Sequence, residues 1–440
     1  MDSIQLIDDG VYDFKGETFD SEIHLSNITV SKPRYLRFFK CTFNFPLIIE
    51  ELHFPNIIVS FSQCTFNEGV KVYRCNVLEL KFTGIIKVKD INIEYLNSEL
   101  LRFNSQNVIS DDFTISKSII RNFDCSNLED FRGRFLAEIN RHSENNNPIE
   151  CSFRNSSINS LELYGNIGSG NFERLSVKEG AFFNANFDTS YFNNSFFGRN
   201  TTFNDCEFSS TVSFKNCRVK NEMNFQVCNF KKHVFFSNAE FQYFSISDTT
   251  FEARVSFLGM EVENINTHLV NFNRIAHFDE IKIKDILSCN RKTLRTIKQE
   301  LYKTDNKIDY NRFRAYELAA YYRELNFKKN FVDKSVLGLT ILFTGYNYNW
   351  FRAFIVTVLT GMLFYSILYF FEFYVALNLN NDDGFSSGAF RFFLVTDFFS
   401  PFLDRKYLNN GYSWTIFVLG KIFIAFGIYE MIQAFRKFKA

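Results

Sequence analysis

The amino-acid sequence predicts a mainly β solenoid followed by helices, the last two of which are long and apolar enough to cross a membrane. Three observations lead to this prediction. Large apolar residues recur every five or six positions over most of the first 285 residues, helical spacing replaces this period after residue 290, and the long apolar runs all lie after residue 330. With 58 Phe but only 5 Pro and 19 Gly in 440 residues, collagen-like and ordinary disordered chains are excluded.

The charge balance and the N-terminal sequence limit where the chain can be located and what it can bind. The 49 basic residues balance 49 acidic ones, and this neutrality argues against nucleic-acid binding, which needs a basic surface. Residues 1–34 are predicted to form an acidic N-terminal cap. They carry no apolar run of the kind found in secretory signals, so we expect this end of the chain to stay in the cytoplasm. In that reducing compartment the nine cysteines should be free thiols.

The five- or six-residue period is clearest in the second half of the repeat. No helix explains it, because a step of five turns about 140° and scatters the side chains around the axis. A flat strand does not explain it either, because an odd step alternates between its two faces. A chain that bends at a corner about every five residues keeps all of them on one inner side, which predicts a solenoid with a square cross-section. The residues that carry the period are Phe182, Phe187, Phe192, Phe197, Phe203, Phe208, Phe214, Val219, Phe225, Phe230, Phe236, Phe241, Ile246, Phe251, Phe257 and Val262.

A second, small residue stands two positions before many of these large ones, and a separation of two keeps both on the same face. Seven of the nine cysteines occupy this slot, which explains them as small core residues rather than as metal ligands or nucleophiles. There is no CxxC, the six histidines form no ligand-spaced pair, and no phosphate-binding glycine motif occurs. We therefore predict no catalytic, cofactor-binding or metal-binding residues, and a protein that is not an enzyme. The slot holds Cys41, Cys64, Cys75, Cys151, Ala185, Cys206, Cys217, Cys228 and Ala239.

Stretches such as CTFNF, CEFSS, CNFKK, ANFDT and AEFQY resemble the pentapeptide-repeat family. The resemblance implies a right-handed quadrilateral parallel β-helix, which we assign to residues 35–287, with the frequent six-residue steps indicating bulged corners. Residues 128–148 interrupt the period and are predicted to form a short helix and loop. Two alternatives stay open for this segment, namely a plain insertion and an arm that contacts a partner.

Residues 288–331 return to helical spacing and are predicted to form a basic helical neck. Between Arg291 and Lys329 there are eleven Lys or Arg and five acidic residues, a net charge of +6. A helical hairpin here would cap the open end of the solenoid, and its charge would also suit contact with anionic lipid headgroups. Residues 332–352 contain an apolar run too short to span a bilayer, which predicts an interfacial helix.

Residues 353–440 form the predicted two-transmembrane module, with spans at 353–377 and 412–435. The connecting loop has four acidic and three basic residues, whereas basic residues flank the outer limits of the pair. The positive-inside rule then places both chain ends in the cytoplasm. The flanking residues are Lys328, Lys329, Lys334, Arg352, Arg436, Lys437 and Lys439.

Residues 389–402, between the spans, are apolar but short and are predicted to re-enter the membrane or to lie at its surface. This layout resembles that of two-span ion-channel pores. No Thr-Val-Gly-Tyr-Gly filter is present, and the comparable position reads TDFFSP, which argues against potassium selectivity. The C-terminal YEMIQAFRKF is similar to the end of bacterial membrane proteins that join pentapeptide-like repeats to two terminal helices. This resemblance implies a location in a bacterial inner membrane.

Charged residues inside apolar spans are the candidate functional residues. We predict that Glu372 and Lys421 pair across the helical hairpin, the alternative being that each reaches the interface separately. Asp397 would line a pore mouth if protomers assemble around an axis, and otherwise faces water. Glu430 is predicted to pair locally with Arg436.

Three functions are compatible with these patterns. The favoured hypothesis is a membrane-anchored scaffold or sensor, whose cytosolic solenoid binds a protein and whose helices contact the lipid bilayer. The second is a homo-oligomeric ion channel gated by the solenoid. The third, mimicry of DNA towards topoisomerase as in some soluble pentapeptide-repeat proteins, fits poorly, since those proteins are acidic and this chain is neutral.

Overall fold

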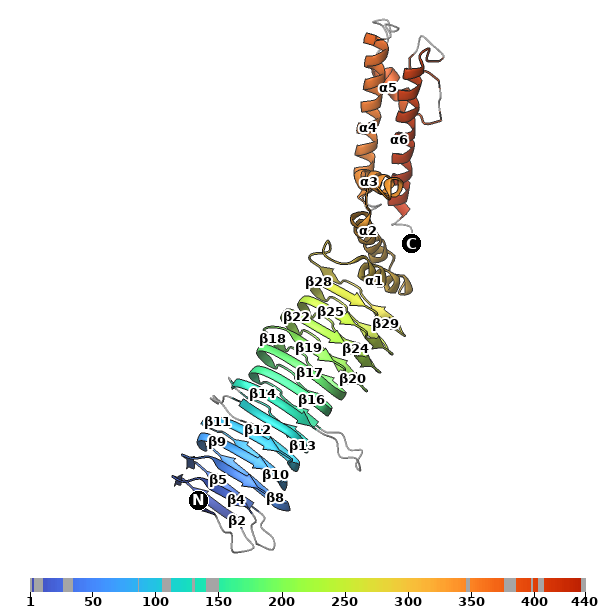
Figure 1. Cartoon of the computed structure of the whole chain (residues 1–440). Helices are drawn as coiled ribbons and strands as arrows, with labels where there is room; N and C mark the ends of the chain where they lie inside the picture. Colours follow the sequence, from blue (N-terminus) through green and yellow to red (C-terminus); the bar gives the residue numbers. More distant parts are fainter. Residues whose placement is uncertain are drawn as a thin grey trace. The chain divides into compact units, whose positions relative to one another are not determined.

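The computed structural model describes residues 2–3, 11–26, 35–85, 87–104, 112–128, 131–139, 150–345, 349–375, 385–396, 399–402 and 407–436. The chain divides into two compact units, residues 1–293 and 294–440. Figure 1 shows a β-solenoid in the first unit and helices in the second.

The first unit is a parallel solenoid of about 11 coils. Its strands are β1 (Asp2–Ser3), β2 (Val11–Lys15), β3 (Thr18–Phe19), β4 (Ile23–Ser26), β5 (Tyr35–Phe39), β6 (Thr42–Phe43), β7 (Leu47–Glu50), β8 (His53–Ser62), β9 (Thr65–Tyr73), β10 (Asn76–Thr83), β11 (Lys87–Glu94), β12 (Asn97–Asn104), β13 (Asp112–Asp124), β14 (Phe131–Ile139), β15 (Glu150–Ser152), β16 (Ser157–Asn171), β17 (Ser176–Tyr191), β18 (Phe196–Phe197), β19 (Thr201–Asn204), β20 (Glu207–Phe208), β21 (Val212–Ser213), β22 (Arg218–Gln226), β23 (Asn229–Phe230), β24 (Val234–Phe235), β25 (Glu240–Ser247), β26 (Thr250–Phe251), β27 (Val255–Ser256), β28 (Glu261–His268), β29 (Asn271–Phe272), β30 (Ala276–His277) and β31 (Lys282–Ile283).

Successive coils pair in parallel, so that equivalent residues stack and form four inward columns. The predicted fold class is therefore confirmed. In one column, ring centroids of successive Phe residues lie 4.5–5.2 Å apart and nearly parallel, which adds aromatic stacking to the burial of each ring. Phe183, and not the predicted Phe182, is the buried residue at the start of the period, because side chains alternate along the strand. The columns in the last coils are Phe172–Phe192–Phe214–Phe236–Phe257–Phe278, Val177–Phe197–Val219–Phe241–Val262–Ile283, Phe183–Phe203–Phe225–Ile246 and Phe187–Phe208–Phe230–Phe251–Phe272.

Two neighbouring corners differ in backbone conformation and in length. Asp205 has a φ of 53°, in the left-handed region, and lies within the five-residue step from Phe203 to Phe208. No described residue between Phe208 and Phe214, a six-residue step, has a positive φ. A left-handed residue turns the chain sharply, so that corner needs one residue fewer. The buried small slot predicted from the sequence follows directly after it, as at Cys206.

Two of the predicted boundaries in this unit are wrong. The solenoid begins before residue 35, because β2, β3 and β4 already pair with the next coil and Phe14 stacks on Phe38 at 4.9 Å. Within residues 128–148, Phe131–Ile139 is not a helix but strand β14, which pairs with β13 and β16. Apolar residues at alternate positions, such as Phe135 and Ala137, are buried there, and this alternation holds the segment in the solenoid. Residues 140–149 lie outside the described residues.

The second unit is helical, and α1 begins three residues before it. The predicted helical neck is present as α1 and α2. A helix, α3, covers most of the apolar run predicted as interfacial, and its place at the membrane surface stays a prediction. The side chain of Asn306 caps α2 by accepting a hydrogen bond from the Asp309 amide, and Gly345, with a φ of 61°, ends α3. The helices are α1 (Arg291–Lys303), α2 (Lys307–Glu324), α3 (Phe331–Thr344), α4 (Trp350–Phe370) with its π-helical continuation η1 (Phe371–Val375), α5 (Phe385–Phe393) and α6 (Gly411–Arg436).

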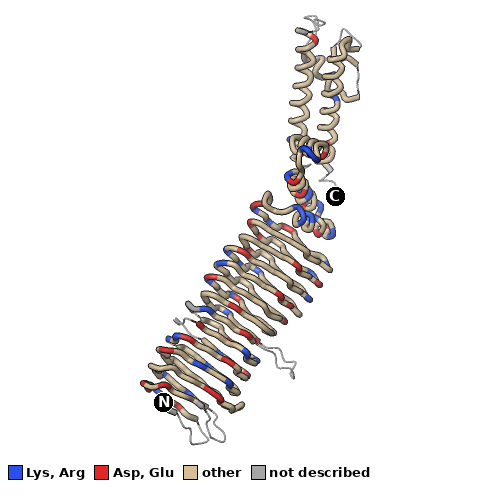
Figure 2. Tube along the Cα trace, in the orientation of Figure 1, with Lys and Arg blue, Asp and Glu red and all other residues tan. Residues whose placement is uncertain are grey.

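Helices α4 and α6 pack along each other, as Figure 1 shows, and α5 contacts both. Two helical segments, Trp350–Tyr374 and Gly411–Phe435, are long and apolar enough to cross a membrane. The core of this hairpin is aromatic, with Tyr365, Phe392 and Phe417 buried. Figure 2 shows many charged residues, Lys and Arg among them, on α1 and α2, whereas α4 and α6 are almost free of charge.

Candidate functional site

Three of the four predicted site residues lie buried in the helical unit, and the fourth, Asp397, lies outside the described residues. Glu372, Lys421 and Glu430 expose 0%, 4% and 3% of their surface. Burying a charge costs free energy unless hydrogen bonds or an opposite charge compensate it. The partners of each residue therefore indicate its role.

Glu372 belongs to η1, where the helix widens by one residue per turn at the end of α4. Its carboxylate accepts a hydrogen bond from the Ser413 hydroxyl at the start of α6. Ser413 is itself completely buried. The contact joins the two long helices at the end where the loop connects them.

Lys421, on α6, binds the C-terminal end of the short helix α5. Its Nζ donates a hydrogen bond of 2.5 Å to the carbonyl oxygen of Leu394, the residue directly after α5. The same nitrogen lies 5.5 Å from the ring centroid of Phe392 and 5.0 Å from that of Phe417. A cation is favourable at the C-terminal end of a helix, where carbonyl groups lack partners, and over aromatic faces. Lys421 thus ties α5 to α6.

The contacts of Glu372 and Lys421 lie at different levels of α6. Ser413, which binds Glu372, precedes Lys421 by eight residues, or about 12 Å along the helix axis. The direct ion pair between Glu372 and Lys421 therefore stays a prediction, and the hydrogen bonds found for the two residues are to Ser413 and to the Leu394 carbonyl.

Glu430 joins α6 to α3. Its two carboxylate oxygens accept hydrogen bonds from Thr340 Oγ1 at 3.1 Å and from Thr344 Oγ1 at 3.0 Å. The side chain of Arg436, its predicted partner, lies outside the described residues. Sequence reasoning missed the two threonines, although their spacing of four within an apolar run places both hydroxyls on one face of the helix.

The helices approach each other most closely at glycines. A Cβ on Gly427 would lie 2.1 Å from the hydroxyl oxygen of Thr357 on α4, and one on Gly420 would lie 2.5 Å from the Phe392 ring of α5. No larger residue fits at either position without displacing its neighbour. The hairpin is therefore packed with small-residue contacts of the kind common between membrane helices.

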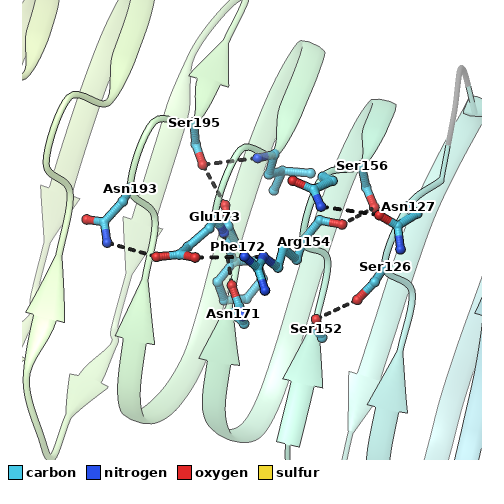
Figure 3. A network of polar contacts seen from close by, with 12 residues as sticks. Ser126, Asn127, Ser152, Arg154, Ser156, Asn171, Phe172, Glu173, Asn193 and Ser195 are labelled. Carbon is cyan, nitrogen blue, oxygen red and sulfur yellow. Dashed lines mark hydrogen bonds and ion pairs between the residues drawn. The ribbon is translucent and has the colours of Figure 1, made fainter.

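The polar groups at the corners of the solenoid are engaged in its own hydrogen bonds. Figure 3 shows Ser156 and Ser195 in the small slot of two coils. Ser195 Oγ accepts from the Leu175 amide at 3.2 Å and donates to the carbonyl oxygen of Phe172 at 2.5 Å, both on the preceding coil. Ser156 does the same for Leu128 and Cys125. These hydroxyls satisfy buried backbone groups, which gives them a structural role.

The cysteines in the slot behave in a similar way. All nine are free and buried, as predicted. Cys228 Sγ donates to the carbonyl oxygen of Phe203 on the preceding coil. Burial raises the pKa of the Cys64 and Cys75 thiols to about 11, so that both stay protonated and unreactive at neutral pH. Within the described residues, no group of three or more His, Cys, Asp or Glu is placed to hold a metal ion.

The fold and these contacts define a class: a β-solenoid protein with two long apolar helices at its C-terminal end. No protein-family model, curated protein or solved structure matches the chain.

Proposed function

We propose that the chain is a membrane-anchored recognition protein, in which α4 and α6 span the bilayer and the solenoid binds a protein partner. The observation that carries this proposal is the exposure of apolar surface on the two helices. Only 22% of the most apolar window of the first helix and 33% of that of the second are buried. Leu359, Leu363 and Ile422 expose 64%, 59% and 57% of their surface. A core helix of a soluble protein would bury such residues, whereas lipid covers them in a membrane.

The same proposal includes the family, the membrane location and the type of activity of the protein. The repeat pattern supports membership of the pentapeptide-repeat family, and the basic residues before α4 support a bacterial inner-membrane location with both chain ends in the cytoplasm. The engagement of the buried hydroxyls and thiols in backbone hydrogen bonds supports a binding role rather than an enzymatic one.

Alkaline carbonate extraction of membranes from cells that express the full chain tests the anchoring. The protein should stay in the membrane pellet. A variant with Leu359, Leu363 and Ile422 changed to Gln should be lost from that pellet, because three polar side chains oppose insertion. Ile308→Gln, at an exposed position of α2, is the matched control and should remain. Release of the unchanged protein by carbonate would refute the proposal.

An ion channel is the second candidate, and the packing of α5 against both long helices favours it. If the channel hypothesis holds, the purified chain forms a closed ring, and Asp397→Asn changes conductance or ion selectivity in single-channel recordings. A monomer without conductance would eliminate this candidate.

A further inference from the structure

A shallow hollow of about 540 Å³ lies on the last coils of the solenoid. It forms where one corner recurs in three successive coils, between the β23–β26–β29 stack and the β24–β27–β30 stack. The corner residues include Lys232 and His233 in the first coil, Arg254 in the second and Arg274 in the third. All four are exposed. The regular stacking of the coils thus brings residues about 20 positions apart to one surface.

This hollow, which we call the basic corner, has an excess of positive charge. Its lining contains four Lys or Arg and one acidic residue, Glu252. Lys231 is compensated by Glu207 of the preceding coil at 2.6 Å. Lys232, Arg254 and Arg274 form no ion pair with any residue in the described part of the chain. Three exposed cations therefore remain on neighbouring coils.

Several other cations of the solenoid lie opposite acidic residues on neighbouring coils. Arg218 pairs with Glu240 at 3.2 Å and Lys282 with Glu261 at 2.6 Å, and further pairs recur along the earlier coils. Like charges close together on adjacent strands destabilise a sheet, whereas opposite charges stabilise it. The basic corner departs from this arrangement, and the departure indicates a surface that receives negative charge from another molecule.

We infer that the basic corner binds an acidic peptide segment of a protein partner. This rests on the proposed role of the solenoid as a recognition surface. Ile275, 40% exposed, and Ala253 give the rim an apolar part that suits a peptide side chain. Glu252, within the lining, would repel the closely spaced charges of a continuous polyphosphate, and the neutral chain lacks the basic surface that nucleic acids need.

The test uses the full chain in amphipol and a fluorescein-labelled peptide of twelve alternating Glu and Ala residues, with binding measured by fluorescence anisotropy. The peptide should bind, and binding should weaken as salt rises. Changing Lys232, Arg254 and Arg274 together to Gln should raise Kd about tenfold or more, as three partly solvated charges allow. The matched control changes Lys40, Arg74 and Lys117, exposed cations of earlier corners, to Gln and should alter Kd less than twofold.

Several results would overturn the inference. These are the absence of saturable binding, equal weakening in both triple variants, and equal affinity for a peptide with Gln in place of Glu. Displacement of the peptide by millimolar inorganic phosphate or by phosphatidylglycerol vesicles, but not by phosphatidylcholine vesicles, would assign the corner to phosphate groups instead. Failure of the anchoring appears separately in carbonate extraction, since a soluble chain that binds the peptide would refute the anchor and keep this site.

Discussion

The corner hydroxyls show how single residues stabilise a coil. Ser195 is 1% exposed and bonds two backbone groups that water does not reach. Thr249 occupies the same slot at another corner, and its hydroxyl accepts from the Cys228 amide. Thr293, in α1, accepts in the same way from the Thr267 amide of the last coils. An unpaired buried amide costs about 1–3 kcal/mol, so these few hydroxyls matter more than the many exposed polar residues.

Ser195→Ala should open the coil locally, because the Leu175 amide keeps only the Phe172 carbonyl as acceptor and that carbonyl loses the Ser195 hydroxyl as donor. The loss of such a hydrogen bond, about 0.5–1.5 kcal/mol, corresponds to roughly 2- to 10-fold faster hydrogen exchange in the peptide that contains Leu175. Ser209→Ala, which removes a partly buried hydroxyl bonded to the Glu207 side chain, is the control and should leave that peptide unchanged. Unchanged exchange in Ser195→Ala would show that the hydroxyl is dispensable.

Lys421→Met should release α5 from α6 while keeping the length and apolar contacts of the side chain. Without the ammonium group, the carbonyl oxygen of Leu394 loses its donor and the C-terminal end of α5 its cation. We expect faster hydrogen exchange in residues 385–394 by about tenfold, measured by mass spectrometry on the protein in nanodiscs. The control is the double variant Lys421→Met with Met431→Lys, which returns a lysine to α6 at another position. It should not recover the slow hydrogen exchange of residues 385–394. Normal protection of α5 in Lys421→Met would contradict the role given to this lysine.

Among the helices, a partly buried carboxylate joins α1 to α2. Glu317 accepts hydrogen bonds from Lys298 Nζ at 2.5 Å and Arg295 Nε at 2.8 Å. Burial alone would raise the pKa of this carboxyl, but the two cations outweigh burial and hold the pKa below its ordinary value of 4.5. The interaction therefore stabilises the helical neck above pH 4.5 and is lost as the pH falls through the lowered pKa.

The neck should thus keep constant protection from pH 7 to about pH 5 and lose it at lower pH. Hydrogen exchange of residues 291–324, corrected for the intrinsic rate at each pH, measures this. Glu317→Gln should be less protected at neutral pH and should lack the acid transition. Glu324→Gln, which changes an exposed acid at the end of α2, provides the control. An acid transition of equal size in Glu317→Gln would assign the effect to another group.

The order of the elements could be predicted because the spacing of apolar residues along the sequence depends on which side of each element is buried. The Phe residues at steps of five and six identified the square coil, and the apolar runs identified α4 and α6. Strand β14 was missed, because the alternation at Phe135 and Ala137 has a period of two instead of five. The partners Ser413, Thr340 and Thr344 were missed for another reason. Their contacts depend on how α3, α4 and α6 pack, and a single sequence does not encode that packing in a readable period.

In the whole molecule, the two units treat their apolar residues differently. The solenoid buries its apolar residues within its coils, whereas α4 and α6 leave many of theirs exposed. We therefore propose that the long helices cross a membrane and that the solenoid lies on the cytoplasmic side. The buried cysteines help in testing this claim, since the unchanged protein should react little with thiol reagents.

The most direct measurement is labelling of single introduced cysteines in bacterial spheroplasts with a membrane-impermeant maleimide. Tyr412→Cys lies at the start of α6, and Tyr243→Cys lies on the solenoid, and both positions are exposed. We expect Tyr412→Cys to be labelled in intact spheroplasts and Tyr243→Cys to be labelled only after the membrane is opened. Labelling of Tyr243→Cys from outside intact spheroplasts, or equal labelling of both positions before and after opening, would contradict this expectation.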